Sequence, residues 1–79
     1  MTREDIKEKF ENVLTDYFDI EDEINYNDKL QDLDLDSIDE VELIMHLENE
    51  FNISIPDHEV NNQMNLEDWI NLINSKVIN

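Results

Sequence analysis

The residue with the clearest chemical potential in this chain is Ser37, a hydroxyl at the start of an acidic, apolar-striped segment. Its context supports two interpretations. In one, Ser37 and Glu40 form a Ser-x-x-Glu capping box, and the hydroxyl only closes the first turn of a helix. In the other, Asp36 is the N-cap and leaves the Ser37 hydroxyl free beside the positive end of the helix. A phosphodiester attached there would meet unsatisfied backbone N–H groups, so this interpretation predicts a phosphate-linked group on Ser37.

The same surroundings argue against nucleophilic catalysis by Ser37. A nucleophilic serine needs a positioned base and an oxyanion hole. His46 follows more than two helical turns later, His58 lies beyond a predicted helix break, and we expect both to face solvent. The chain has no glycine that could form a sharp nucleophile elbow. We therefore predict that Ser37 is not a catalytic nucleophile.

An aspartate-rich segment before Ser37 imitates a calcium loop. The spacing Asp32-x-Asp34-x-Asp36 is that of the first ligands of an EF-hand. The pattern then fails, because Ser37 stands where the loop needs glycine and Leu43 stands where it needs a bidentate glutamate. We therefore predict no dedicated metal site, only loose binding of Mg²⁺ or Ca²⁺ by clustered carboxylates.

The spacing of apolar residues defines the helices that would position Ser37. The predicted helices cover residues 3–17, residues 37–50, a short stretch over 57–62 and a last stretch that includes Leu66 and Val77. Thr2 and Asp5 form a plausible capping pair for the first, and Pro56 precedes the short one. Residues 18–35 form a long connection that should pack across the bundle. The predicted fold class is all-α: a small four-helix bundle with three main helices, one short helix and a long loop between the first two.

The helix that begins at Ser37 carries two apolar stripes when its residues are placed about 100° apart. The first stripe contains Leu43, Ile44, Leu47 and Phe51 and should face the core. The second stripe contains Ile38, Val41 and Met45 and lies on another side. It is either buried against a second neighbour or exposed as a recognition surface, and periodicity alone does not decide. Glu42 and Glu48 flank the second stripe, while Asp39 lies on a third, polar side.

Composition narrows the class of protein. A chain of 79 residues is enough for one small domain, which we expect to span residues 1–79. The net charge of −17 argues against nucleic acid and anionic membrane surfaces and favours basic proteins or divalent cations as partners. With no cysteine, no membrane-spanning apolar run and no secretory leader, a cytoplasmic location is expected.

With these residues in view, the chain resembles an acyl carrier protein. The match centres on Asp36-Ser37-Ile38-Asp39-Glu40-Val41-Glu42-Leu43 and continues through the acidic helix to Ile55-Pro56-Asp57. The family's Asp-Ser-Leu attachment motif is followed by such a helix and by an Ile-Pro step. The layout of three main helices, one short helix and a long first loop also matches. The resemblance is strong over residues 32–57 and extends by pattern over nearly the whole chain.

The resemblance implies a carrier protein that is not itself an enzyme. A phosphopantetheinyl transferase would attach 4′-phosphopantetheine, taken from coenzyme A, to Ser37, and the arm would hold acyl groups as thioesters. By the same analogy Asp36, Asp39, Glu42 and Glu48 would meet basic patches on acyl-activating and acyl-processing enzymes. The second stripe (Ile38, Val41 and Met45) would supply apolar contact to these partners. Leu47 and Phe51 would help line the space that shelters short acyl chains. The expected carrier is a monomer.

Two departures from the family pattern keep alternatives open. Ile38 replaces the usual leucine, a mild change, and Asp34-Leu35 stands where Gly-Ala is common in fatty-acid carriers. Fatty acid biosynthesis is the expected pathway. The alternatives are a specialised carrier for polyketide, nonribosomal peptide or other acyl transfer, and an unmodified acidic adaptor that binds a basic protein through the same helix.

Overall fold

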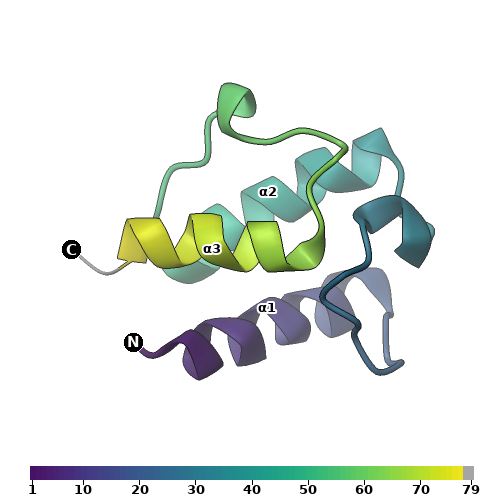
Figure 1. Ribbon diagram of the computed structural model, residues 1–79, viewed down its shortest axis with the longest axis horizontal. Coiled ribbons are helices and arrows are strands. Elements are labelled where there is room, and N and C mark those ends of the chain that lie inside the picture. The colour runs from purple at the N-terminus through teal and green to yellow at the C-terminus, as the bar shows by residue number, and fades with distance from the viewer. Residues whose placement is uncertain (78–79) are drawn as a thin grey trace.

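The computed structural model describes residues 1–77 (Figure 1). It contains three α-helices, which are α1 (Arg3–Phe18), α2 (Ser37–Phe51) and α3 (Leu66–Val77), and two 3-10 turns, η1 (Leu30–Leu33) and η2 (Asp57–Glu59). The all-α prediction is confirmed, and the three main helices lie close to their predicted bounds. Residues 78 and 79, at the end of the domain expected over residues 1–79, lie outside the described residues.

Short polar side chains begin and end the helices. Thr2 Oγ1 accepts from the Asp5 N–H at 3.2 Å, and the Thr2 N–H donates to Asp5 Oδ2 at 3.0 Å, which confirms the predicted capping pair of α1. Asp19, Asp34 and Asn52 follow α1, η1 and α2 in the left-handed conformation, with φ of 56°, 62° and 54°. The chain has no glycine, so aspartate and asparagine, the residues that best tolerate this conformation, take the C-cap positions.

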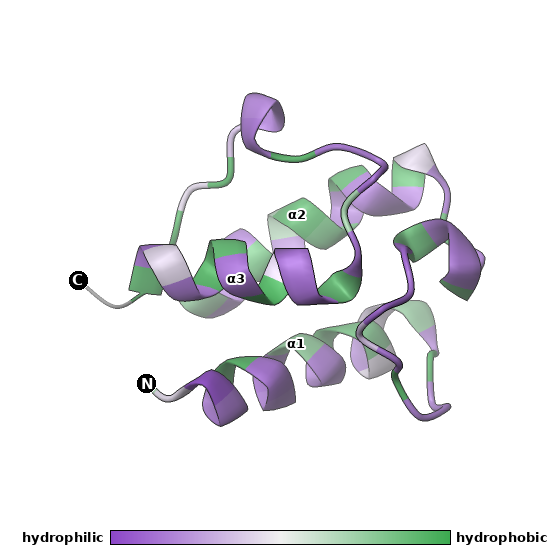
Figure 2. Ribbon diagram, in the orientation of Figure 1, coloured by the Kyte–Doolittle hydropathy of each residue, from purple (hydrophilic) through white to green (hydrophobic). Residues whose placement is uncertain are grey.

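The core lies between α1 and the other two helices, which both pack against it. Figure 2 shows hydrophilic residues along the outer side of α1 and hydrophobic ones on the side turned toward its neighbours. The buried apolar residues are Ile6, Phe10, Val13, Leu14, Leu30, Leu43, Ile44, Leu47, Phe51, Ile55, Leu66, Trp69, Ile70 and Ile73. Every α-helix contributes to this set, and Leu30 and Ile55 come from the connections. The first stripe of α2 is therefore core, as predicted.

The connection between α1 and α2 is held against the start of α3. The Leu66 N–H donates to the Asp28 carbonyl at 2.8 Å, and the Glu67 N–H donates to the Tyr26 carbonyl at 3.0 Å. The turn η1 follows directly, and the Leu35 N–H bonds the Leu30 carbonyl at 3.1 Å. These bonds bring η1 and the first residues of α2 and α3 to one end of the molecule, where Ser37 lies.

The short helix expected over residues 57–62 is not confirmed, and the four-helix bundle is not confirmed with it. The structure has the single 3-10 turn η2 there, in the segment that arches from the end of α2 to the start of α3 (Figure 1). Val60 ends the turn in an extended conformation, with φ −125° and ψ 155°. The half-buried Val60 side chain packs against the core. The helical turn ends at the residue that makes this contact.

Candidate functional site: an exposed serine at the start of α2

Asp36, not Ser37, caps helix α2. The Asp36 Oδ1 atom accepts from the backbone N–H groups of Ile38, at 3.0 Å, and Asp39, at 2.9 Å. In return, Asp39 Oδ2 accepts from the Asp36 N–H at 3.0 Å, which completes a reciprocal capping box. Ser37 is the first helical residue and is exposed, and no hydrogen bond within residues 1–77 engages its hydroxyl. Of the two interpretations of this serine, the structure therefore supports the free hydroxyl.

The same cap weakens the anion site that the sequence predicts. Asp36 has already taken the N–H groups of Ile38 and Asp39, and the Glu40 N–H bonds the Asp36 carbonyl at 2.9 Å. Hydrogen bonds, led by that from the Asp39 backbone N–H, lower the pKa of the Asp36 carboxyl, so it is ionised at neutral pH. The expectation that a phosphodiester would meet several unsatisfied N–H groups is therefore wrong in part. A group on Ser37 has to be held by a covalent bond, which the exposed hydroxyl can form.

The second stripe of α2 is exposed. Ile38, Val41 and Met45 keep 68%, 57% and 56% of their accessible surface, whereas the first stripe is buried. Large apolar side chains that remain in water at helical spacing, on the helix that begins at Ser37, are typical of a recognition surface. The structure thus selects the exposed alternative that periodicity left open.

The carboxylates around the second stripe differ in the structural hydrogen bonds that they form. Asp36 and Asp39 form the capping box. Glu48 is half-buried, and its Oε2 accepts from the Ile55 N–H at 2.8 Å. Glu42 is exposed, and no hydrogen bond or ion pair within residues 1–77 engages its side chain. Of the four carboxylates named for partner contact, Glu42 alone has no structural role in the described part of the chain.

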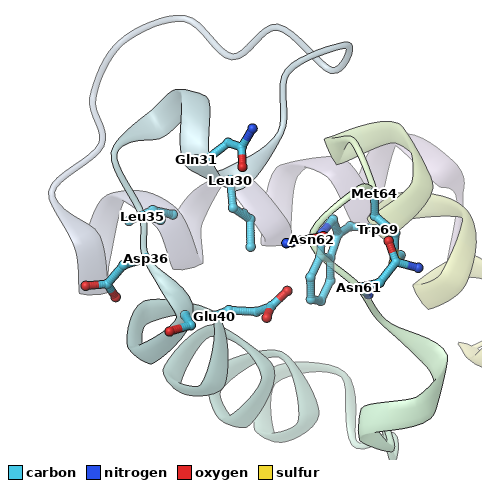
Figure 3. Close-up of a pocket in the computed structure, with 10 residues that line it drawn as sticks. Leu30, Gln31, Leu35, Asp36, Glu40, Asn61, Asn62, Met64 and Trp69 are labelled. Atoms are coloured by element: carbon cyan, nitrogen blue, oxygen red, sulfur yellow. The ribbon is translucent and has the colours of Figure 1, made fainter.

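A pocket of about 200 Å³ opens beside Ser37. It is lined by Leu30, Gln31, Leu35, Asp36, Ser37, Glu40, Asn61, Asn62, Met64 and Trp69. In Figure 3 the side chains of Leu30 and Glu40 project into the space toward Trp69, while Asp36 points away. Leu47 and Phe51, expected to line an acyl space, are core residues that do not line this pocket. The spacing of Trp69 from Leu66 and Ile73 places it in the last predicted helix, and no other signal in the sequence assigns it to a site.

The two histidines lie apart from this site. His58 is exposed, as expected. His46 is half-buried, and its ring stacks on Tyr17 of α1 with centroids 3.6 Å apart. The expectation that His46 faces solvent is wrong, because the Tyr17 ring of α1 covers one face of its imidazole. Neither histidine lines the pocket beside Ser37.

Two other kinds of site are absent from the described residues. Within residues 1–77, no group of three or more histidine, aspartate or glutamate side chains is arranged to hold a metal ion. In the same part of the chain, no helix has the length and apolar character needed to cross a membrane.

Known proteins resemble this chain over most of its length. The family described as "Phosphopantetheine attachment site" matches residues 5–73. The acyl carrier protein of Thermosynechococcus vestitus is 37% identical over 79 residues, which cover 98% of each chain. That of Lactobacillus acidophilus is 39% identical over 77 residues, covering 95% of this chain and 96% of the relative. That of Chlorobium phaeobacteroides is 38% identical over 78 residues, covering 96% and 100%.

These matches extend almost from end to end and include the exposed serine, its aspartate cap and the acidic helix. They favour a modified carrier over an unmodified adaptor. Family membership also implies a phosphopantetheinyl transferase and acyl-processing enzymes as interaction partners. The chain belongs to the acyl carrier protein family, whose members are not enzymes and carry acyl groups on a covalently attached phosphopantetheine.

Proposed function

We propose that Ser37 is the attachment residue and that the protein is an acyl carrier of fatty acid biosynthesis. The observation that carries the proposal is the exposed Ser37 hydroxyl, which is free because Asp36 has taken over the cap. The arm supplies a thiol that holds acyl groups as thioesters. We further propose that residues 1–79 act as one carrier domain and work as a cytoplasmic monomer.

The residues around Ser37 prepare it for modification. The reciprocal bonds between Asp36 and Asp39 fix the first turn of α2 and keep the Ser37 side chain at its solvent-facing start. In the transfer, the Ser37 oxygen would form the new phosphodiester bond as the pyrophosphate bond of coenzyme A breaks. Adenosine 3′,5′-bisphosphate would leave, and the serine proton would pass to a base of the transferase. Neither histidine of the carrier lines the pocket beside Ser37.

The second stripe and Glu42 form the proposed docking surface. Ile38, Val41 and Met45 offer exposed apolar area, and Glu42 offers a carboxylate with no structural role in the described residues. The net charge of −17 attracts basic patches at a distance, and salt weakens this attraction. Such contacts suit a shuttle that has to dissociate after each reaction. Asp36, Asp39 and Glu48 remain proposed partner contacts through oxygens that their structural hydrogen bonds leave free.

The alternative of a specialised carrier for polyketide, nonribosomal peptide or other acyl transfer rested largely on Asp34. Asp34 adopts φ 62° and ψ 29°, the left-handed conformation that glycine favours. The turn before Ser37 is thus available without glycine, and this departure does not weigh against a fatty-acid carrier. The relatives named acyl carrier protein, matched over 96–100% of their own length, support the general carrier.

Intact-mass measurement tests the attachment site. The protein is incubated with coenzyme A and a broad-specificity phosphopantetheinyl transferase, beside a carrier known to be modified. We expect the mass of one arm on the wild type and on Ser54→Ala, an exposed serine outside the site, and none on Ser37→Ala. Failure to modify the folded wild type, or modification that persists in Ser37→Ala, would reject Ser37 as the attachment residue. Loading by candidate acyl-activating enzymes then tests the pathway.

A further inference from the structure

We propose that the stacked rings of Tyr17 and His46, the Tyr17–His46 pair, form a binding site for an arginine side chain of a basic partner protein. The pair lies outside the docking surface proposed above, because Tyr17 belongs to α1. It extends that surface from α2 onto a second helix. The inference rests on the proposed function for the kind of partner, a protein with a basic patch, and adds the residue type that this partner presents.

Tyr17 is an aromatic ring that remains in water. It keeps 60% of its accessible surface although its ring stacks on that of His46, with centroids 3.6 Å and planes 13° apart. The other large apolar side chains exposed within residues 1–77 are Met1, at the terminus, and the second stripe of α2. Tyr17 is therefore the only exposed aromatic residue in this part of the chain. Tyrosine and arginine are two of the residue types that contribute most to contacts between proteins.

Contacts on both helices hold the Tyr17 ring in place. The His46 ring covers one of its faces, and Phe18 meets the same imidazole in a T-shaped arrangement, with centroids 6.2 Å apart. The end of α1 is fixed as well, because the Thr15 hydroxyl donates to the Ile20 carbonyl at 2.9 Å. A partner thus meets a ring whose orientation is already set, and this lowers the entropic cost of binding.

The charged residues next to the pair are acidic. Asp16 precedes Tyr17, Asp19 follows it by two residues, and both are exposed. Glu42 is also exposed and lies one helical turn before His46, on the same side of α2. An aromatic ring among carboxylates favours a cation that can also stack. Arginine meets both requirements, because its planar guanidinium stacks on aromatic faces and donates to carboxylates.

The basic residues of this chain are used elsewhere. Within residues 1–77, neither of the lysines that lie over an aromatic ring lies over Tyr17. All five basic residues contact other parts of the chain: Arg3 with Glu67, Lys7 with the Tyr26 ring, Lys9 with the Phe51 ring, Lys29 with Gln63, and Lys76 with Glu59. A second copy of the chain is a poor source of the arginine, since each copy has a net charge of −17. The cation therefore comes from a different, basic protein.

One partner can contact Ser37 and the pair together. His46 follows Ser37 by nine residues on α2, which is about 14 Å along the helix axis. A typical protein contact buries about 800 Å² on each partner, which is a patch about 30 Å across. An enzyme that acts at Ser37 and lies along α2 therefore reaches the Tyr17–His46 pair in the same encounter.

Titration of the full chain with tetra-arginine and tetralysine, two peptides of equal charge, tests the site. The titrations are followed by NMR at about pH 8, where an ordinary histidine is uncharged. We expect tetra-arginine to shift the ring resonances of Tyr17 and His46 and to bind more tightly than tetralysine. The expected difference in Kd is about two- to fivefold, the usual size of a cation–π contact at an exposed site.

Variants distinguish stacking from simple charge attraction. Tyr17→Leu keeps an apolar side chain without a ring, so it should weaken tetra-arginine binding by that factor and change tetralysine binding little. Tyr17→Phe keeps the ring and should bind both peptides like the wild type. His46→Gln removes the ring that supports Tyr17 and should reduce the preference for arginine. Val41→Ala is the matched control, because it removes exposed apolar area on α2 and leaves both rings in place.

Competition with the transferase tests the partner. Tetra-arginine should raise the KM of arm transfer to the wild type more than tetralysine does at the same concentration. With Tyr17→Leu the two peptides should compete equally, since only the attraction between opposite charges remains. Equal competition with the wild type would show that the transferase does not contact the pair, and would overturn the assignment of the partner.

Other results would overturn the site itself. Equal Kd values for the two peptides, or ring resonances of Tyr17 and His46 that do not shift with tetra-arginine, would show that no arginine binds there. Equal losses of tetra-arginine binding in Tyr17→Leu and Val41→Ala would show a response to apolar area alone. If Tyr17→Leu does not fold, the wild-type titrations decide. The titrations need no arm, so this site can fail while intact mass shows the arm on Ser37, and it can hold if Ser37 is rejected.

Discussion

Glu48 of α2 accepts a hydrogen bond from the backbone N–H of Ile55 through Oε2, at 2.8 Å. Ile55 is 3% exposed and belongs to the core, and it directly precedes Pro56. The bond ties the last turns of α2 to the segment that returns toward α3. A carboxylate that the sequence suggests for partner contact thus also holds the fold.

Glu48→Ala should lower the free energy of unfolding by about 1.5–3 kcal/mol, the usual contribution of a hydrogen bond to a charged group. Glu48→Gln keeps a hydrogen-bond acceptor and should lower the free energy of unfolding by less than Glu48→Ala. Glu42→Ala, an exposed carboxylate on the same helix, should change stability by less than about 0.5 kcal/mol. Urea unfolding followed by circular dichroism gives the three values. Equal effects at Glu48 and Glu42 would show that the bond to Ile55 contributes nothing to stability.

Asp36 should make the free energy of unfolding fall as the solution becomes more acidic. Its pKa is lower in the folded protein than the ordinary value of 3.8, chiefly because of the hydrogen bond from the Asp39 backbone N–H. The ionised Asp36 carboxylate therefore stabilises the fold fully above pH 3.8. This stabilisation is lost as pH falls through the lower pKa of the folded protein. Asp36→Asn keeps a good N-cap without an ionisable group.

Urea unfolding between pH 7 and pH 2 checks this prediction. The stability difference between wild type and Asp36→Asn should be constant well above pH 3.8 and should shift against the wild type below that value. Glu50→Gln, which removes an exposed charge outside the cap, controls for the loss of one negative charge. A difference that stays constant through the acid range would mean that the Asp36 cap does not titrate as described.

Local patterns in the sequence predict the helices well. Periodic apolar residues and the Thr2–Asp5 cap depend on neighbours within a few positions, so α1, α2 and α3 could be placed without tertiary information. The role of Ser37 was harder to predict, because Asp36 and Ser37 both suit the N-cap position. Only the hydrogen bonds from the Ile38 and Asp39 N–H groups show which of the two residues is the cap. Likewise, a helical wheel separates the two stripes of α2 but does not say which of them a neighbour covers.

Features formed by distant residues could not be predicted in this way. Leu30 and Trp69 line the same pocket because backbone hydrogen bonds hold their segments together. One of these runs from the Leu66 N–H to the Asp28 carbonyl. His46 is covered because Tyr17 of α1 stacks on it. The helix expected over residues 57–62 is only a single turn, since Val60 is extended and packs against the core. In each case the deciding contact comes from outside the local pattern.

Asp34→Gly should stabilise the protein. A left-handed conformation costs an ordinary L-residue about 1–2 kcal/mol, less for aspartate, and glycine removes this cost at the expense of a more flexible unfolded chain. With φ at 62° the balance favours glycine by up to about 1 kcal/mol, whereas Asp34→Ala should be destabilising. Asn52→Gly, at φ 54°, is a matched position after α2 and should behave similarly. Thermal unfolding measures all three, and a lower Tm for Asp34→Gly would contradict the argument.

The docking surface should be separable from stability. Glu42→Lys reverses an exposed charge, and Met45→Ala removes exposed apolar area, so neither should change the free energy of unfolding by more than about 0.5 kcal/mol. Both should lower kcat/KM for arm transfer by the transferase, and Glu42→Lys should also reduce its dependence on salt. Glu50→Lys makes the same charge change on the polar side of α2 and should have a smaller effect. Equal losses from Glu42→Lys and Glu50→Lys would indicate a response to net charge, with no defined docking surface.

Salt should stabilise the folded chain, because its charges are mostly of one sign. The net charge is −17, from 22 acidic and five basic residues. Within residues 1–77 the ion pairs Arg3–Glu67 and Lys76–Glu59 engage only two of these acidic residues. At 0.01 M salt the screening length is about 30 Å, close to the longest extent of the molecule, 33 Å, so carboxylates repel across the whole fold. At 0.1 M it falls to about 10 Å and only neighbours interact. Relief of about 1 kcal/mol of repulsion would raise Tm by about 4–8 °C.

A comparison of NaCl with MgCl₂ at equal ionic strength identifies the cause of this stabilisation. If screening alone acts, the two salts should raise Tm equally. A larger rise with Mg²⁺ would show loose binding by clustered carboxylates, as the segment from Asp32 to Asp36 suggests. Asp32→Asn should then reduce the Mg²⁺ excess without changing the response to NaCl. A Tm that is indifferent to both salts would show that carboxylate repulsion does not limit stability, despite the net charge of −17.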